Sequence, residues 1–82
     1  MISPREAIAI FENANPQLTI LECAKYEGYA YLVSATKDPT KTSYNTPYFL
    51  IDGKSGKIEH FDPLPNLDKM RRAFRDHKIN RI

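Results

Sequence analysis

The side chains suited to acid–base or nucleophilic chemistry are few in this 82-residue chain. His60 lies close to Glu59 and Asp62, a grouping that could pair an imidazole with a carboxylate. Adjacent residues of a strand point to opposite faces, however, so Glu59 would not orient His60. We therefore expect His60 to be a partly exposed structural residue. We expect His77 to lie near a helix C-terminus, where the helix dipole favours a cation.

Neither the single cysteine nor the glycine-rich turn completes a known catalytic motif. Cys23 falls in an expected strand rather than at a helix N-terminus, so no local feature activates its thiol. One Cys and two His at scattered positions show no metal-ligand spacing. The turn at 52–57 contains Gly and Lys, but no helix follows it to complete a phosphate-binding loop. The sequence therefore predicts no catalytic residue, metal site or cofactor, and we expect the protein not to be an enzyme.

Three tyrosines could instead contact a partner protein. Tyr29 and Tyr31 alternate on an expected strand, and Tyr44 lies in the polar connection at 36–47. Tyrosine is enriched at interfaces because it combines apolar area with a polar tip. The connection is either a binding loop or a surface link between strands, and we favour the link because it offers only hydroxyls and one phenol. We expect the partner to be another protein or a second copy of this chain.

The basic residues gather at the C-terminus. Residues 68–82 contain six Lys and Arg against two Asp, whereas the whole chain has a net charge of only +2. Arg71, Arg75 and Lys78 share one side of an expected helix and could contact phosphates. The alternative is a solvated helix face, which we favour because the sequence lacks the exposed-aromatic motifs of RNA-binding domains. Nucleic acid is therefore the less favoured partner.

Two helices are expected, one at each end of the chain. Ser3, Pro4 and Glu6 form a helix-start signal of cap, first-turn proline and capping-box acid, and they predict a helix over residues 4–14. A second helix is predicted over residues 67–78. Its apolar positions have helical spacing and should face a sheet: Leu67, Met70 and Phe74.

Strands are expected between the helices. Apolar runs predict strands over 18–24 and 29–35, separated by a turn at 25–28. A hairpin is predicted over 48–61, with Gly56 taking the positive φ that closes its turn. The sequence thus predicts one α+β domain spanning residues 1–82. We expect a four-stranded, mainly antiparallel meander with both helices packed on one face.

Composition places the chain among globular proteins. It is 41% hydrophobic and 27% charged, which excludes a disordered chain. A single cysteine allows no internal disulfide and favours a reducing compartment. The longest N-terminal apolar run, 7–11, is too short for a signal-peptide core or a membrane span. We expect a cytoplasmic protein that does not contact membranes.

Three short segments carry a family resemblance. They are Ser-Pro-Arg-Glu-Ala-Ile at 3–8, Gly-Tyr-Ala-Tyr-Leu-Val at 28–33, and Ile-Asp-Gly-Lys-Ser-Gly-Lys-Ile at 51–58. In these segments the chain resembles the PepSY-like domains over residues 3–62. The resemblance implies a helix followed by strands that end in a hairpin, and a binding or inhibitory module without catalytic residues. More loosely, the chain resembles the accessory proteins of bacterial prophages.

Overall fold

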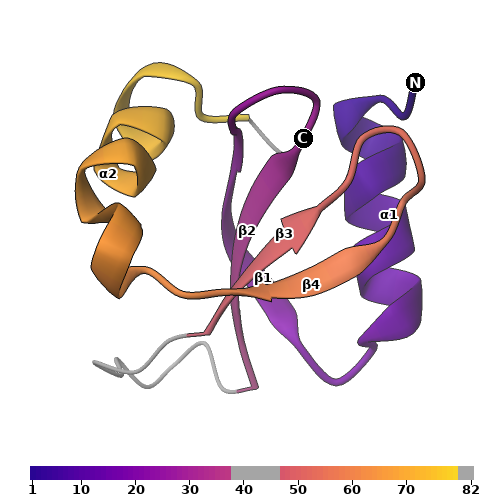
Figure 1. Cartoon of the computed structure of the whole chain (residues 1–82). Helices are drawn as coiled ribbons and strands as arrows, with labels where there is room; N and C mark the ends of the chain where they lie inside the picture. The colour runs from indigo at the N-terminus through magenta and orange to yellow at the C-terminus, as the bar shows by residue number, and fades with distance from the viewer. Residues whose placement is uncertain (38–46, 80–82) are drawn as a thin grey trace.

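The computed structural model describes residues 1–37 and 47–79. It confirms the predicted α+β class, with a four-stranded antiparallel sheet and a helix at each end of the chain (Figure 1). The elements in chain order are α1 (Pro4–Ala14), β1 (Thr19–Lys25), β2 (Tyr31–Thr36), β3 (Tyr48–Ile51), β4 (Ile58–Phe61), the short 3₁₀ helix η1 (Leu64–Asn66) and α2 (Leu67–Asp76).

The first helix begins and ends where the sequence predicts. The Ser3 hydroxyl accepts a hydrogen bond from the Glu6 backbone N–H at 3.2 Å, which satisfies one of the amides left free at a helix start. Pro4 occupies the first turn, and Asn15 follows the last helical residue. Ala7 and Phe11 are fully buried, so this side of α1 faces the sheet.

The strands form a meander in the order β1-β2-β3-β4, with every neighbouring pair antiparallel. The β1–β2 register shifts between Ile20 and Glu22. The predicted second strand starts two residues too early, because Tyr29 and Ala30 belong to the preceding turn and β2 begins at Tyr31.

The predicted hairpin at 48–61 is confirmed, and its turn is closed by local hydrogen bonds. The Asp52 carboxylate accepts bonds from the Lys54 backbone N–H at 3.0 Å and from the Ser55 hydroxyl at 2.9 Å. Gly56 has a φ of 78° and donates its N–H to the Asp52 carbonyl at 2.8 Å. A residue with a Cβ is strained at this φ, so the turn requires glycine there.

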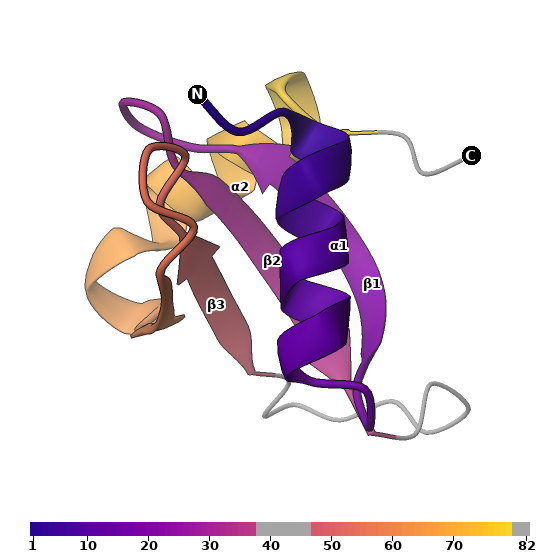
Figure 2. The same ribbon diagram turned by 90° about the vertical axis from the view of Figure 1, so that its right-hand side faces the viewer.

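The two helices cover opposite faces of the sheet (Figures 1 and 2), so the prediction that both pack on one face is wrong. The Phe49 ring lies 5.1 Å from the Phe11 ring of α1. The Tyr48 ring lies 6.2 Å from the Phe74 ring of α2. Because neighbouring strand residues point to opposite faces, the two helices lie on different sides. The physical reason is that five consecutive β2 residues, 31–35, are buried, so both faces need a cover.

Each face of the sheet has its own apolar layer. The larger layer, under α1, consists of Ala7, Phe11, Ile20, Cys23, Tyr31, Val33, Ala35, Phe49 and Ile51. Strand alternation turns Ala24 and Leu32 to the other face, where Met70 and Ala73 of α2 are also buried. Leu67, which was expected to face the sheet, is 38% exposed, and Phe74 is only partly buried. The second layer is therefore the thinner one.

The chain returns to the sheet after α2. The Lys25 N–H donates to the His77 carbonyl at 3.1 Å, and the Ile79 N–H donates to the Cys23 carbonyl at 2.8 Å. Ala24 and Lys78 form an isolated antiparallel bridge. The helix predicted to reach residue 78 therefore stops at Asp76, because residues 77–79 pair with the outer edge of β1 instead.

Candidate interaction surface at the turn between β1 and β2

Tyr31, predicted as a partner contact, is a core residue. Its side chain is 8% exposed, and its hydroxyl donates a hydrogen bond to the Ile2 carbonyl at 2.7 Å. This bond ties the segment before α1 to the start of β2. Because Tyr31 is almost wholly buried, it offers a partner little area, and we leave it out of the candidate surface.

Tyr29, by contrast, is 53% exposed and projects from the turn at residues 26–30. The Tyr26 N–H donates to the Ala30 carbonyl at 2.9 Å, and Gly28 takes a φ of 66°. The turn predicted between the first two strands is thus confirmed, although it extends to Ala30. Tyr44, the third predicted tyrosine, lies outside the described residues.

The N-terminal segment and the β3–β4 turn lie beside the β1–β2 turn (Figure 2), which contains Tyr29. Gly53 approaches so closely that a Cβ atom built on it would overlap the Tyr29 carbonyl oxygen. The Ile2 N–H donates to the Gly53 carbonyl at 2.8 Å. The Lys54 Nζ lies 5.1 Å from the centre of the Tyr29 ring, within the range of a cation–π contact. The Tyr29 backbone is therefore held by Gly53 and its ring contacts Lys54, while the residue remains more than half exposed.

Two hollows border Tyr29. One, of about 190 Å³, lies toward the N-terminus and is lined by Met1, Ile2 and Ala30, among others. The other, of about 370 Å³, lies toward the β3–β4 hairpin and is lined in part by Leu50 and Lys54. Met1 is 82% exposed, so it adds apolar area beside the tyrosine. We call the group made of Met1, Ile2, Tyr29, Ala30 and Lys54 the Tyr29 surface.

Sequence reasoning missed the role of Gly53. We singled out Gly56 for its positive φ, and that φ is observed. Gly53 is needed for a different reason, which is the closeness of the Tyr29 backbone. The sequence did show a second glycine, Gly53, three residues before Gly56. The residue that requires it, Tyr29, lies 24 residues away in the chain and comes close only on folding.

The predicted basic residues are exposed, but two of the three are matched by carboxylates. The Arg75 guanidinium donates to the neighbouring Asp76 carboxylate at 3.0 and 3.1 Å, and these bonds hold the Asp76 pKa below its ordinary value. The Lys78 Nζ lies 3.9 Å from a Glu22 oxygen. Lys78 also lies beyond the end of α2, so the three residues do not form the continuous helical stripe that was predicted.

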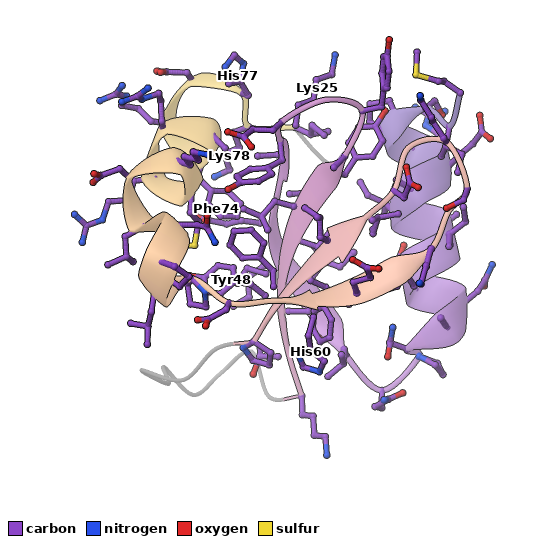
Figure 3. All side chains as sticks on the ribbon, in the orientation of Figure 1. Lys25, Tyr48, His60, Phe74, His77 and Lys78 are labelled. Atoms are coloured by element: carbon purple, nitrogen blue, oxygen red, sulfur yellow. The ribbon has the colours of Figure 1, made fainter. Side chains whose placement is uncertain are left out.

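The remaining reactive side chains considered in the sequence are Cys23, His60 and His77. Cys23 is fully buried on the α1 side. His60 is exposed on β4, with its ring 5.0 Å from the Phe49 ring, and His77 is exposed beyond the end of α2 (Figure 3). Within residues 1–37 and 47–79, no group of three or more His, Cys, Asp or Glu could hold a metal ion.

Comparisons of the chain with protein-family models, curated proteins and solved structures found no significant match. The resemblance to PepSY-like domains therefore stays a prediction. In the part of the chain that the structure describes, no helix has the length and apolarity needed to cross a bilayer.

Proposed function

We propose that this protein is a non-catalytic interaction module that binds another protein through the Tyr29 surface. The observation that supports the proposal is that Tyr29 is exposed to solvent and is also held in place by neighbouring residues. Tyr29 is 53% exposed, yet the Lys54 ammonium lies over its ring and Gly53 packs on its backbone. A partner that covers this ring loses little side-chain entropy in doing so, because the ring is already positioned.

The shape of the surface supports the same proposal. A projecting aromatic ring between two hollows can enter a partner's cavity and receive the partner's own side chains. Tyrosines in such positions often contribute much of the binding energy. The resemblance to PepSY-like domains, which implies a binding or inhibitory module, and the looser likeness to prophage accessory proteins fit this role. The single thiol, Cys23, fits a reducing compartment such as the cytoplasm.

Nucleic-acid binding through the basic C-terminal residues has less support. Arg75 and Lys78 already have carboxylate neighbours, and a phosphate would have to compete with these. Of the three predicted residues, Arg71 alone forms no ion pair with a described residue, and a single arginine gives only a weak, salt-sensitive contact. We therefore place the partner at Tyr29 rather than at α2.

Site-specific cross-linking in the host cell tests the proposal. A photoreactive phenylalanine analogue replaces Tyr29 in one variant and Ala9, which is exposed on the outer side of α1, in a control variant. We expect one protein to be cross-linked from position 29 and not from position 9. The purified partner should then bind the wild type and lose most of its affinity for Tyr29→Ala, although circular dichroism shows that this variant is folded.

Three results would contradict the proposal. They are a cross-linked species common to both positions, no cross-link from position 29, and a partner that binds Tyr29→Ala as tightly as the wild type. A cross-linked product with twice the mass of the chain would identify the partner as a second copy.

A further inference from the structure

A third hollow borders the β1–β2 turn on the side that faces α2, and its floor is apolar. Its volume is about 370 Å³. The floor includes Tyr26, whose ring packs edge-on against Phe61 at 5.2 Å, and Ala73, which is 5% exposed. The Lys25–His77 backbone hydrogen bond joins β1 to the segment after α2 and so fixes the two sides of the hollow relative to each other. We call this hollow the Tyr26 pocket.

The rim of the Tyr26 pocket is cationic. It is lined by four basic side chains, those of Lys25, Lys69, Arg72 and His77. Glu27 contributes the one carboxylate among the lining residues. Glu27 binds Lys69, with 2.9 Å between the carboxylate oxygen and the Nζ. Lys25 and Arg72 form no ion pair with any described residue, although the Arg72 charge is near enough to the Asp76 carboxylate to help lower its pKa. Within the described residues, both cations are therefore open to direct contact with a bound anion. Figure 3 places Lys25 and His77 at the same end of the molecule.

Helix geometry separates this pocket from the predicted basic stripe. Lys69, Arg72 and Ala73 follow i, i+3, i+4 spacing, which brings them to one side of α2. At about 100° per residue, Arg71 points to the opposite flank from Lys69. Arg71 is therefore a matched control for Arg72, being an exposed arginine on the same turn that does not line the pocket.

We propose that the Tyr26 pocket binds a small organic anion, with its phosphate or carboxylate group at Lys25 and Arg72 and its apolar body against Tyr26 and Ala73. Guanidinium and ammonium groups recognise both kinds of anion through charge-assisted hydrogen bonds. The volume is at the lower end of the range for small-molecule sites, which suits a ligand of one ring and one anionic group. This activity is separate from protein binding at the Tyr29 surface.

The Glu27–Lys69 ion pair makes the proposal specific. An anion in the pocket meets the Glu27 carboxylate as a like charge and competes with it for Lys69. Glu27→Gln should therefore free Lys69 and tighten binding. Glu59→Gln is the matched control, because Glu59 is also an exposed glutamate paired with a lysine, Lys57, at 3.4 Å, and it does not line this pocket.

The test is a nuclear magnetic resonance titration of the full chain with phenyl phosphate. We expect the amide signals of residues 25–28 and 69–73 to shift together, with weaker responses to inorganic phosphate and to phenol. Benzoate as a further ligand separates carboxylate from phosphate recognition. Arg72→Ala should weaken phenyl phosphate binding about fivefold, the upper range for an exposed charge pair, whereas Arg71→Ala should change it less than about twofold.

The remaining outcomes are equally decisive. Tighter binding by Glu27→Gln, with Glu59→Gln like the wild type, supports the pocket. Equal losses in Arg71→Ala and Arg72→Ala would show only a diffuse attraction to basic charge, and would overturn the proposal. Shifts that spread over α2 without residues 25–28, or no shifts at all, would also overturn it.

Discussion

Tyr48 and Phe49, neighbours on β3, pack against different helices. Phe49 contacts Phe11 of α1, with 5.1 Å between the ring centres, and Tyr48 contacts Phe74 of α2 at 6.2 Å. Successive side chains of β3 thus enter the two apolar layers on opposite faces of the sheet. The layers differ in burial, since Phe11 is fully buried whereas Phe74 is only partly so. Their contributions to stability should differ accordingly.

The first prediction compares these two phenylalanines. Phe11→Ala should lower the free energy of unfolding by about 3–5 kcal/mol, because it removes a fully buried ring and leaves a cavity. Phe74→Ala should lower it by about half as much, because part of this ring already contacts solvent. Urea denaturation of both variants measures the difference. A loss in Phe74→Ala equal to that in Phe11→Ala would mean that the α2 layer is as well buried as the α1 layer.

The second prediction concerns Tyr31. Tyr31→Phe removes the hydrogen bond from the hydroxyl to the Ile2 carbonyl and should cost about 0.5–1.5 kcal/mol. The bond from the Ile2 N–H to the Gly53 carbonyl remains in this variant and still holds Ile2 in the Tyr29 surface, so a binding assay should show at most a small loss of affinity for the partner. Lost affinity with unchanged thermal stability would instead place Tyr31 at the interface.

The third prediction concerns the β3–β4 turn. Gly53→Ala should be destabilising by about 1–3 kcal/mol, since its methyl group would overlap the Tyr29 carbonyl oxygen and the backbone must move apart. Gly56→Val should cost at least about 1 kcal/mol through strain at a φ of 78°. Gly53→Ala should also perturb the amide signals of residues 28–31, because the overlap is with the Tyr29 backbone itself. If Gly53→Ala melts at the wild-type temperature, the close approach to Tyr29 does not exist.

The fourth prediction is a pH dependence at Asp52. Hydrogen bonds from the Lys54 N–H and then the Ser55 hydroxyl hold the pKa of this carboxylate below its ordinary value. A carboxylate whose pKa is lower in the folded state stabilises the fold above about pH 4, the ordinary Asp value, and this contribution is lost as pH falls through the folded pKa. Thermal melts at several pH values should show that Asp52→Asn loses less stability on acidification than the wild type does. If the melting temperatures of the two proteins fall in parallel with decreasing pH, Asp52 is not the source of the acid sensitivity.

The fifth prediction separates the two kinds of partner. Reversing Arg71, Arg75 and Lys78 to Glu should leave the fold intact, because all three side chains are exposed. The wild type should show no specific affinity for DNA or RNA at physiological salt in fluorescence anisotropy. Micromolar binding that weakens steeply with salt and disappears in the triple variant would make these basic residues the functional site.

Residues close together in the sequence were sufficient to predict the helices and strands. The Ser3 cap and Pro4 define the start of α1, and Asp52 with Gly56 defines the hairpin turn, because these residues act on backbone groups within a few positions of themselves. The alternation of Tyr29, Tyr31 and Val33 likewise predicted a strand. The apolar residues between them left the buried face undecided.

Tertiary structure decided how these elements combine. The face that α2 covers depends on which apolar face of the sheet is still exposed once α1 has packed. In the structure α2 packs on the second face, and the segment after α2 pairs with the edge of β1. Tyr29 and Tyr31, two residues apart, end in opposite environments because the N-terminal segment buries one and the turn exposes the other. The contacts of Gly53 with Tyr29 and of Lys69 with Glu27 join residues distant in the chain, and no local pattern encodes them.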